Sequence, residues 1–321
     1  VPMVLAYTGI KTFYQCRFRY YLDYILRLDP REDTFFIRLG NMTHGLLESM
    51  YEPGFDFDNA FDKWASEYPF TPKEKALVAG MKEDLRTVVA FNREHQAHMT
   101  EPSVATEVKA QFALDDKTSF KGKLDKVVVV RSGDRRYVAI IDYKTGSEAF
   151  EPEKLAFGAS MQLPTYALLI AHTPGYEDCS LVGFYIQTIM PTSRRSESED
   201  LKLKGRSLAE AVALSAFDDT LARSRFVKGI ALKAGEGSFY LKAPIASAEE
   251  FDSYRKMALD LIEKATTAIR SSDFTIDPKQ FNDGQNSCHY CPFRDVCFRP
   301  DEAVTNITIT KEEIDDGPDV E

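Results

Sequence analysis

Four cysteines constrain the fold of this chain more than any other feature, because they stand at its two ends. Cys16 lies near the start of the 321 residues, and Cys288, Cys291 and Cys297 follow near the end in the spacing C-x2-C-x5-C. Clustered cysteines are typical ligands of zinc or of an iron–sulfur cluster. If one centre binds all four, the fold must bring residue 16 beside the segment 288–297.

The cysteine spacing alone leaves three interpretations open. Zinc could take the cysteines together with His289, whereas an iron–sulfur cluster would take four thiolates. The third interpretation is chance, with three unrelated cysteines in a loop and Cys16 in the core. The remaining cysteine, Cys179, lies in an apolar, strand-like stretch and is expected to be a small buried residue.

Composition and charge describe an ordinary globular protein of the cytoplasm. The chain is 44% hydrophobic and 28% charged, and it contains neither an apolar run long enough to span a membrane nor a signal peptide. Clustered cysteines without a secretory signal favour a reducing compartment. The net charge of −10 argues against a protein that coats nucleic acid, but it leaves room for an enzyme that gathers basic residues in one groove. The chain starts at Val1 without an initiator methionine, as a processed chain or a fragment of a longer one would.

The pattern of residue types predicts a helical beginning followed by a mixed α/β core. Residues 102–190 read as three strands, a helix at 152–172 and a further strand, which predicts a mixed sheet flanked by helices. Continuous helices are expected at 7–28, capped by Thr8, and at 72–99, beginning at Pro72. Another is expected at 207–227. The predicted segments are the helical region 1–101, the core 102–190, a helical and loop extension 191–273, the cysteine-bearing segment 274–300 and an acidic tail 301–321.

A group of charged residues in the predicted core has the chemistry of a divalent-metal site. Alternation along one strand places Asp142 and Lys144 on the same face and Tyr143 on the other. Asp125, from the preceding strand, is the natural companion of Asp142, and charges on a core-facing strand are costly without partners. Two carboxylates and the backbone carbonyl of Tyr143 suit Mg²⁺ or Mn²⁺. Lys144 could position a water or stabilise charge on a phosphate.

Three further positions belong to the predicted site. Gln162 and Tyr166 stand at helical spacing, so they are expected to share a face despite the intervening Pro164 and to contact a phosphate or the lysine. His44 follows Gly40, which would permit a close approach one turn earlier. Each motif alone has a structural interpretation: an exposed ion pair for Asp-x-Lys, a structural histidine for His44, and for Glu107 a strand carboxylate that faces water.

Taken in order, the motifs G-x-x-x-H, G-x-x-D, D-Y-K-T-G and Q-x-x-x-Y resemble the RecB-type branch of the PD-(D/E)xK nucleases. The resemblance implies a restriction-endonuclease-like core in which the histidine and both aspartates bind metal, the lysine is catalytic, and the glutamine and tyrosine support the site. A looser match implies a further acid upstream. The matching positions are His44, Asp125, Asp142, Lys144, Gln162 and Tyr166, with Glu107 as the looser match.

The cysteines resemble those of the iron-containing members of this family. One cysteine in an aromatic helix before the core, joined to a terminal C-x2-C-x5-C, is similar to the C-terminal nuclease domain of AddB-type helicase–nuclease subunits and to the CRISPR-associated adaptation nucleases. The sequence Cys291-Pro292-Phe293-Arg294 fits the same pattern. The resemblance implies a [4Fe–4S] cluster, with zinc as the alternative, that closes a very long loop as a structural staple.

The activity that this resemblance implies is Mg²⁺-dependent exonuclease cleavage of DNA in double-strand-break repair and recombination. The chain has no Walker-type ATPase motif, so unwinding would come from a helicase partner of the AddA type. Two alternatives are a stand-alone exonuclease related to the CRISPR adaptation nucleases and a non-catalytic DNA-binding module that retains the fold. The residues expected to contact DNA phosphates are Lys121, Lys123, Arg194, Arg195 and Arg206.

Overall fold

The computed structural model describes residues 2–28, 33–146, 148–190 and 198–310. The chain divides into two compact units, and both are discontinuous in sequence. The first contains residues 1–5, 31–150 and 162–256, and the second contains residues 6–30, 151–161 and 257–321. These units cut across the five segments expected from the sequence. Among the residues that the structure describes, no helix has the length and apolar character needed to cross a membrane.

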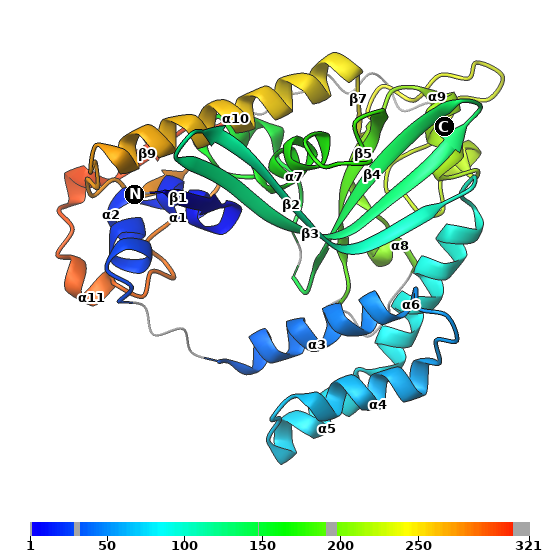
Figure 1. Ribbon diagram of the computed structural model, residues 1–321, viewed down its shortest axis with the longest axis horizontal. Helices are drawn as coiled ribbons and strands as arrows, with labels where there is room; N and C mark the ends of the chain where they lie inside the picture. The colour runs from blue at the N-terminus through cyan, green and yellow to red at the C-terminus, as the bar shows by residue number, and fades with distance from the viewer. Residues whose placement is uncertain (1, 29–32, 147, 191–197, 311–321) are drawn as a thin grey trace. The chain divides into compact units, whose positions relative to one another are not determined.

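A seven-stranded mixed sheet forms the centre of the first unit (Figure 1). The strands run in the order β1-β3-β4-β5-β6-β7, and β2 pairs with β3. Strand β3 pairs antiparallel with β2 and with β4, and β5 pairs antiparallel with β6, whereas β4 with β5 and β6 with β7 are parallel. The bounds are β1 Met3–Ala6, β2 Ser103–Asp115, β3 Thr118–Ser132, β4 Arg135–Lys144, β5 Cys179–Thr188, β6 Lys204–Leu208 and β7 Ile245–Ala246.

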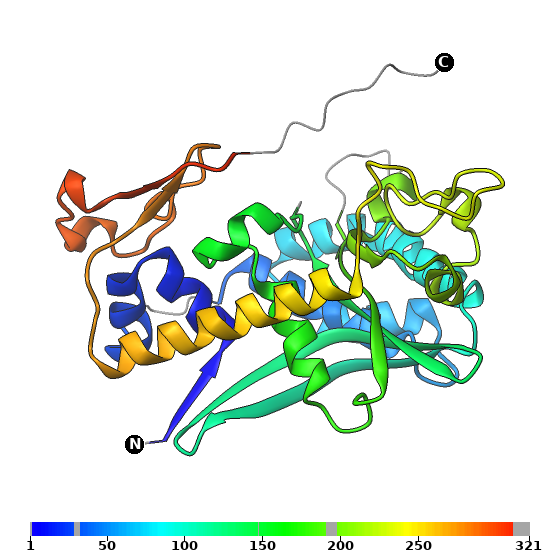
Figure 2. The ribbon, with the colours of Figure 1, turned by 90° about the horizontal axis from the view of Figure 1, so that it is seen from above.

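The middle of the sheet is buried on both faces, which explains its nearly continuous apolar sequence. On β5, Phe184 meets Phe251 of helix α10 (Ala248–Arg270), with ring centroids 5.1 Å apart. The next residue, Tyr185, stacks on Phe217 of helix α9 (Ala211–Phe217) at 5.5 Å. Because successive strand residues point to opposite faces, α9 and the start of α10 cover opposite sides of the sheet. The β2–β3 hairpin extends well beyond this covered centre (Figure 2).

The first unit contains further helices, and one of them, α3, carries the predicted metal ligand His44. Helix α3 begins after a Thr34 cap and carries His44, and its Gly45 lies against the Trp64 ring of α4, where a Cβ atom would come within 2.6 Å of the indole. Helix α5 begins at Pro72 behind a Thr71 capping box. The bounds are α3 Phe35–Ser49, α4 Phe57–Glu67, α5 Pro72–Gly80, α6 Lys82–Ala97, α7 Gln162–Ala171, α8 Ser198–Leu201 and the 3₁₀ turn η3 Leu221–Arg223.

The second unit is built from segments near both ends of the chain, and hydrogen bonds connect them. Arg17 donates its backbone N–H to Asp277 at 2.8 Å and pairs with Asp273 through its guanidinium group. Lys279 donates to the backbone carbonyl of Tyr14, and the two-stranded parallel sheet of β8 and β9 follows. The bounds are α1 Tyr7–Gln15, α2 Arg17–Tyr20, the π-helix η1 Tyr21–Ile25, η2 Pro152–Phe157, β8 Lys279–Phe281, α11 Arg294–Cys297, η4 Asp301–Ala303 and β9 Thr305–Ile307.

The structure corrects several of the expected helices. The helix predicted at 7–28 breaks at Cys16, whose backbone is extended, and its N-cap is Ala6 in place of Thr8. The helix predicted at 72–99 divides at Met81, and the one predicted at 152–172 divides after Gly158, which has a left-handed φ of 75°. The prediction for 207–227 was wrong, because strand β6 ends at Leu208 before the shorter α9. Residues 191–197 and most of the predicted acidic tail lie outside the described residues.

Candidate active site

The residues singled out by the sequence motifs come together in the first unit, at the place where strands β3 and β4 begin to pair. Five elements supply them, two helices and three strands. The pairing of β3 with β4 starts at Lys126 and Ile141, so the residues just before and after lie at the margin of the paired region. The positions are His44 on α3, Glu107 on β2, Asp125 on β3, Asp142 and Lys144 on β4, and Gln162 and Tyr166 on α7.

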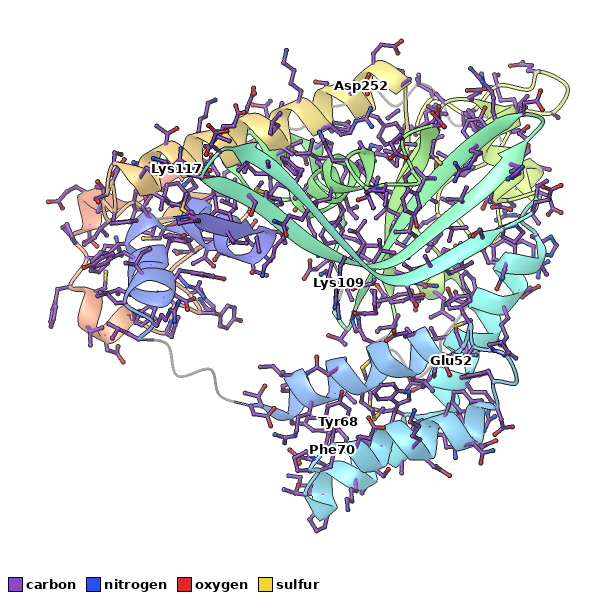
Figure 3. All side chains as sticks on the ribbon, viewed as in Figure 1. Glu52, Tyr68, Phe70, Lys109, Lys117 and Asp252 are labelled. Carbon is purple, nitrogen blue, oxygen red and sulfur yellow. The ribbon has the colours of Figure 1, made fainter. Side chains whose placement is uncertain are left out.

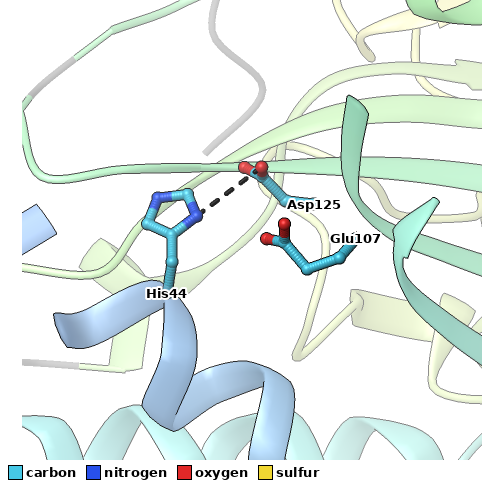
Figure 4. Close-up of side chains that lie close together, drawn as sticks. All are labelled: His44, Glu107 and Asp125. Carbon is cyan, nitrogen blue, oxygen red and sulfur yellow. Dashed lines mark ion pairs between the residues drawn. The ribbon is translucent and has the colours of Figure 1, made fainter. Parts of the chain in front are cut away.

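Three of these side chains form a compact group of ligand atoms (Figure 4). One atom from each of His44, Glu107 and Asp125 lies within 4.8 Å of the others, and His44 Nδ1 is 3.6 Å from Asp125 Oδ1. All three side chains are only partly exposed. Glu107, the loosest of the sequence matches, is therefore part of the acidic group and does not simply face water.

The backbone of Glu107 is unusual for a strand residue. Its φ is 53°, in the left-handed region that non-glycine residues rarely adopt. The β2–β3 pairing is regular on either side, with Thr106 opposite Lys126 and Val108 opposite Leu124. Holding a residue in such a conformation costs about 1–3 kcal/mol, and this strain is typical of functional sites. The distortion therefore lies at the residue whose carboxylate is next to His44 and Asp125. No feature of the sequence predicted this distortion.

Asp142 and Lys144 form the second part of the site. Lys144 Nζ is 2.8 Å from Asp142 Oδ2, which confirms that the two side chains share one face of β4. Asp142 is almost completely buried. Gln162 Nε2 donates to Asp142 Oδ1 at 2.7 Å and lies 3.0 Å from the Tyr166 hydroxyl. Gln162 and Tyr166 share a face as predicted, but the partner of Gln162 is the Asp142 carboxylate and not the lysine.

Burial shapes the electrostatics of the site. It raises the pKa of Asp142 to about 7, with a further increase from the nearby Asp125. Burial also raises the pKa of Asp125, against the effect of a 2.8 Å hydrogen bond from the backbone N–H of Tyr143. The pKa of His44 is lowered by burial, which favours the neutral imidazole that binds metals. For Lys144, burial lowers the pKa, but Asp142 outweighs it and the pKa rises.

This donor set fits a hard divalent cation. Carboxylate oxygens and an imidazole nitrogen are suitable ligands for Mg²⁺ or Mn²⁺. The raised pKa values of Asp125 and Asp142 show that their negative charges lack full compensation in this state. A bound cation would supply that compensation, so the residues present fit a metal.

The pH dependence of stability tests the buried state of Asp142. Its folded pKa of about 7 lies above the ordinary 3.8, so between these values the folded protein holds a proton that the unfolded chain releases. In EDTA, this carboxyl should therefore make the free energy of unfolding fall as pH rises from about 4 to about 7. Urea unfolding across this range should show a weaker fall for Asp142→Asn, but an unchanged one for Asp116→Asn in the exposed β2–β3 turn. Equal slopes for wild type and Asp142→Asn would contradict this assignment.

The residues predicted to contact DNA lie in different surroundings. Lys121 and Lys123 are exposed on β3, and Lys123 forms an ion pair with Glu107. Arg206 lies on β6 with its guanidinium carbon 6.0 Å from the Phe150 ring centroid. Arg194 and Arg195 lie outside the described residues. Gly40, expected to permit a close approach, has nothing within 4 Å of where its Cβ would be.

The four clustered cysteines all belong to the second unit and line one cavity of about 200 Å³. Cys16 is buried, at the break between α1 and α2, and the other three are partly exposed. Burial raises the pKa of the Cys288 and Cys297 thiols, and the neighbouring cysteines raise both pKa values further. Cys179, expected to be buried, is partly exposed at the start of β5 in the first unit.

Comparison with known proteins decides the family. The family model described as the PD-(D/E)XK nuclease superfamily matches residues 4–298. This chain belongs to the PD-(D/E)XK nuclease superfamily. The mixed sheet flanked by helices confirms the predicted fold class.

Curated relatives of this PD-(D/E)XK chain are named as subunits of an ATP-dependent helicase/deoxyribonuclease. The protein from Listeria monocytogenes serotype 4a is 21% identical over 90% of this chain and 29% of its own length. The one from Moorella thermoacetica is 24% identical over 92% of this chain and 30% of its own length. The one from Alkaliphilus oremlandii is 26% identical over 57% of this chain and 17% of its own length. The chain thus spans about a third or less of the length of these relatives.

Proposed function

We propose that the first unit hydrolyses phosphodiester bonds in DNA with the help of Mg²⁺ or Mn²⁺. The observation that carries this proposal is the convergence of His44, Glu107 and Asp125 beside the Asp142–Lys144 pair. A module used only as a scaffold would gain nothing from partly buried carboxylates that lack full charge compensation. Membership of the nuclease superfamily supports the same reaction.

Each side chain of the site has a definite role in this proposal. His44, Glu107, Asp125 and Asp142 would hold the metal, together with the backbone carbonyl of Tyr143. When bound, the cation lowers the pKa of a water and polarises the phosphate. Lys144 orients the attacking water or stabilises charge on the phosphate, since its ammonium already lies against Asp142. Gln162 fixes the orientation of the Asp142 carboxylate, and Tyr166 lies against Gln162.

The relatives suggest the biological setting. Because they are named helicase/deoxyribonuclease subunits, we infer an exonuclease that acts on DNA ends in double-strand-break repair and recombination. A helicase of the AddA type would be its partner and would supply unwinding. The cytoplasm is the expected compartment.

The four cysteines of the second unit are proposed to hold a [4Fe–4S] cluster. The four thiols line one cavity of about 200 Å³, as ligands of one shared centre would. The similarity of their C-x2-C-x5-C spacing to that of iron-containing nucleases favours a cluster over zinc, which remains the alternative.

End-labelled DNA tests the reaction directly. Single- and double-stranded substrates labelled at one end should lose their label in Mg²⁺ or Mn²⁺, and EDTA should stop the loss because the carboxylates need a cation to act. Restoring Mg²⁺ after EDTA should restore cleavage. A gel that resolves the products distinguishes release from the ends from internal cuts. If neither substrate is cleaved in either metal, the chain is a non-catalytic DNA-binding module.

A further inference from the structure

The β2–β3 hairpin carries a row of basic residues next to the acidic site formed by His44, Glu107 and Asp125. Along β3, Phe120 and Leu124 are fully buried, and the α-carbon of Gly122 lies close to Leu169 of α7. The residues between them, Lys121 and Lys123, are exposed. Strand alternation therefore places both lysines on the face of the hairpin that points away from α7.

Strand β2 adds to this row. Lys109 lies directly opposite Lys123, and Gln111 lies opposite Lys121. Both β2 residues are exposed, whereas Ala110 between them is buried, so they belong to the same outward face. Figure 3 shows the Lys109 side chain projecting from the hairpin. The basic row consists of Lys109, Lys121 and Lys123.

The row begins at the acidic site. Lys123 pairs with Glu107, which is two residues from Lys109 on β2 and belongs to the His44–Asp125 group. Lys109 and Lys121, by contrast, have no carboxylate partner among the residues that the structure describes. Two residues along a strand correspond to about 6.8 Å, so the row reaches outward from the acidic group in short steps.

This arrangement is unfavourable for the fold alone. Like charges directly opposite each other on a sheet destabilise the pairing, whereas an opposite charge at Lys109 or Lys123 would stabilise it. Lysine ammonium groups are compact, hydrated point charges that bind phosphate oxygens without reading sequence. Glu107 balances only Lys123, so a polyanion along the hairpin would supply the negative charge that Lys109 and Lys121 lack among the described residues.

We propose that the basic row binds the phosphates of one DNA strand next to the bond that the acidic site cleaves. The inference rests on the proposed nuclease function and deepens it, because it assigns the path of the strand to the β2–β3 hairpin. Lys109 joins Lys121 and Lys123 as a substrate-binding residue. The strand runs along the outward face of the hairpin, away from α7.

The salt dependence of binding tests this path. Fluorescence anisotropy of a labelled single-stranded oligonucleotide is measured in EDTA over a series of salt concentrations, so that the readout needs no hydrolysis. Each lost phosphate contact should reduce the slope of log K against log salt by about 0.7 for single strands. The triple variant Lys109→Gln, Lys121→Gln, Lys123→Gln should therefore bind more weakly, with a slope smaller by about 2.

A matched control removes three other lysines and the same charge. Lys73, Lys75 and Lys228 are exposed and have no ion pair among the described residues, and their triple glutamine variant should keep the wild-type slope. Removal of the like-charge pair opposes the loss of the Lys123–Glu107 ion pair, so the melting temperature of the test variant should stay close to that of the wild type, which circular dichroism checks. A wild-type slope in the test variant, or an equal loss of slope in the control, would overturn the path. Failure of the nuclease proposal shows separately, as wild-type protein that cleaves nothing in Mg²⁺.

Discussion

Substitution of Lys144 by alanine should reduce Mg²⁺-dependent DNA cleavage by about a hundredfold to a thousandfold. The Lys144 ammonium lies 2.8 Å from Asp142 Oδ2, inside a partly buried site where a fixed positive charge acts more strongly than in water. Asp142→Ala should have an equally large effect because it removes a buried carboxylate of the metal site. Both losses are measured as initial rates of label release from end-labelled DNA.

The chain offers a matched control for this pair. Lys82 Nζ lies 2.9 Å from Asp58 Oδ1 and joins α6 to α4, two helices that carry none of the candidate site residues. Lys82→Ala breaks an ion pair of similar length and should retain the wild-type rate. Lys144→Ala should keep the wild-type circular dichroism spectrum, since the proton that Asp142 can take up at about pH 7 removes its unpaired charge. Wild-type cleavage by either Lys144→Ala or Asp142→Ala would exclude the proposed site.

Replacement of Cys291 or Cys16 by serine should remove the cluster and destabilise the second unit. Anaerobically purified wild-type protein should contain iron and absorb broadly at about 400 nm, and each variant should lose both. Linking residue 16 to residues 288–297 closes a very long loop, so the loss of stability should be about 4–5 kcal/mol by analogy with a disulfide crosslink. Thermal unfolding monitored by circular dichroism reports this loss.

Cys179 provides the internal control for the cysteine variants. It lies at the start of β5 in the first unit and is not among the residues that line the cavity of the four clustered cysteines. Cys179→Ser should therefore retain the iron content, the absorbance and the melting temperature of the wild type. Wild-type protein with stoichiometric zinc and no iron would overturn the cluster in favour of the zinc alternative.

The pairing of side chains within the candidate site was predictable where it follows from local periodicity. Alternation along β4 is a backbone property, so Asp142 and Lys144 had to share a face once the strand was recognised. The spacing of Gln162 and Tyr166 on α7 is equally local. The left-handed backbone of Glu107 was not predictable, because no feature of the residues around it distinguishes it from an ordinary strand residue.

Non-local pairing explains the errors in the fold. Residues 204–208 form a strand because β5 and β7 pair with it, although the alanines that follow favour helix. The break at Cys16 lies in a sequence with good helical character, and there the Arg17 backbone N–H is taken by Asp277 from the far end of the chain. The helix and strand propensities of a short segment carry no information about partners that are hundreds of residues away.

The discontinuous second unit also sets an order of events during synthesis. Its three segments begin at residue 6 and continue beyond residue 257, so the ribosome must release nearly the whole described chain before the unit can close. Cys16 therefore emerges long before Cys288, Cys291 and Cys297. Until they follow, its thiol has none of its three partners. Delivery of iron and sulfide to this chain would accordingly be a late step that follows translation of the cysteine-bearing segment.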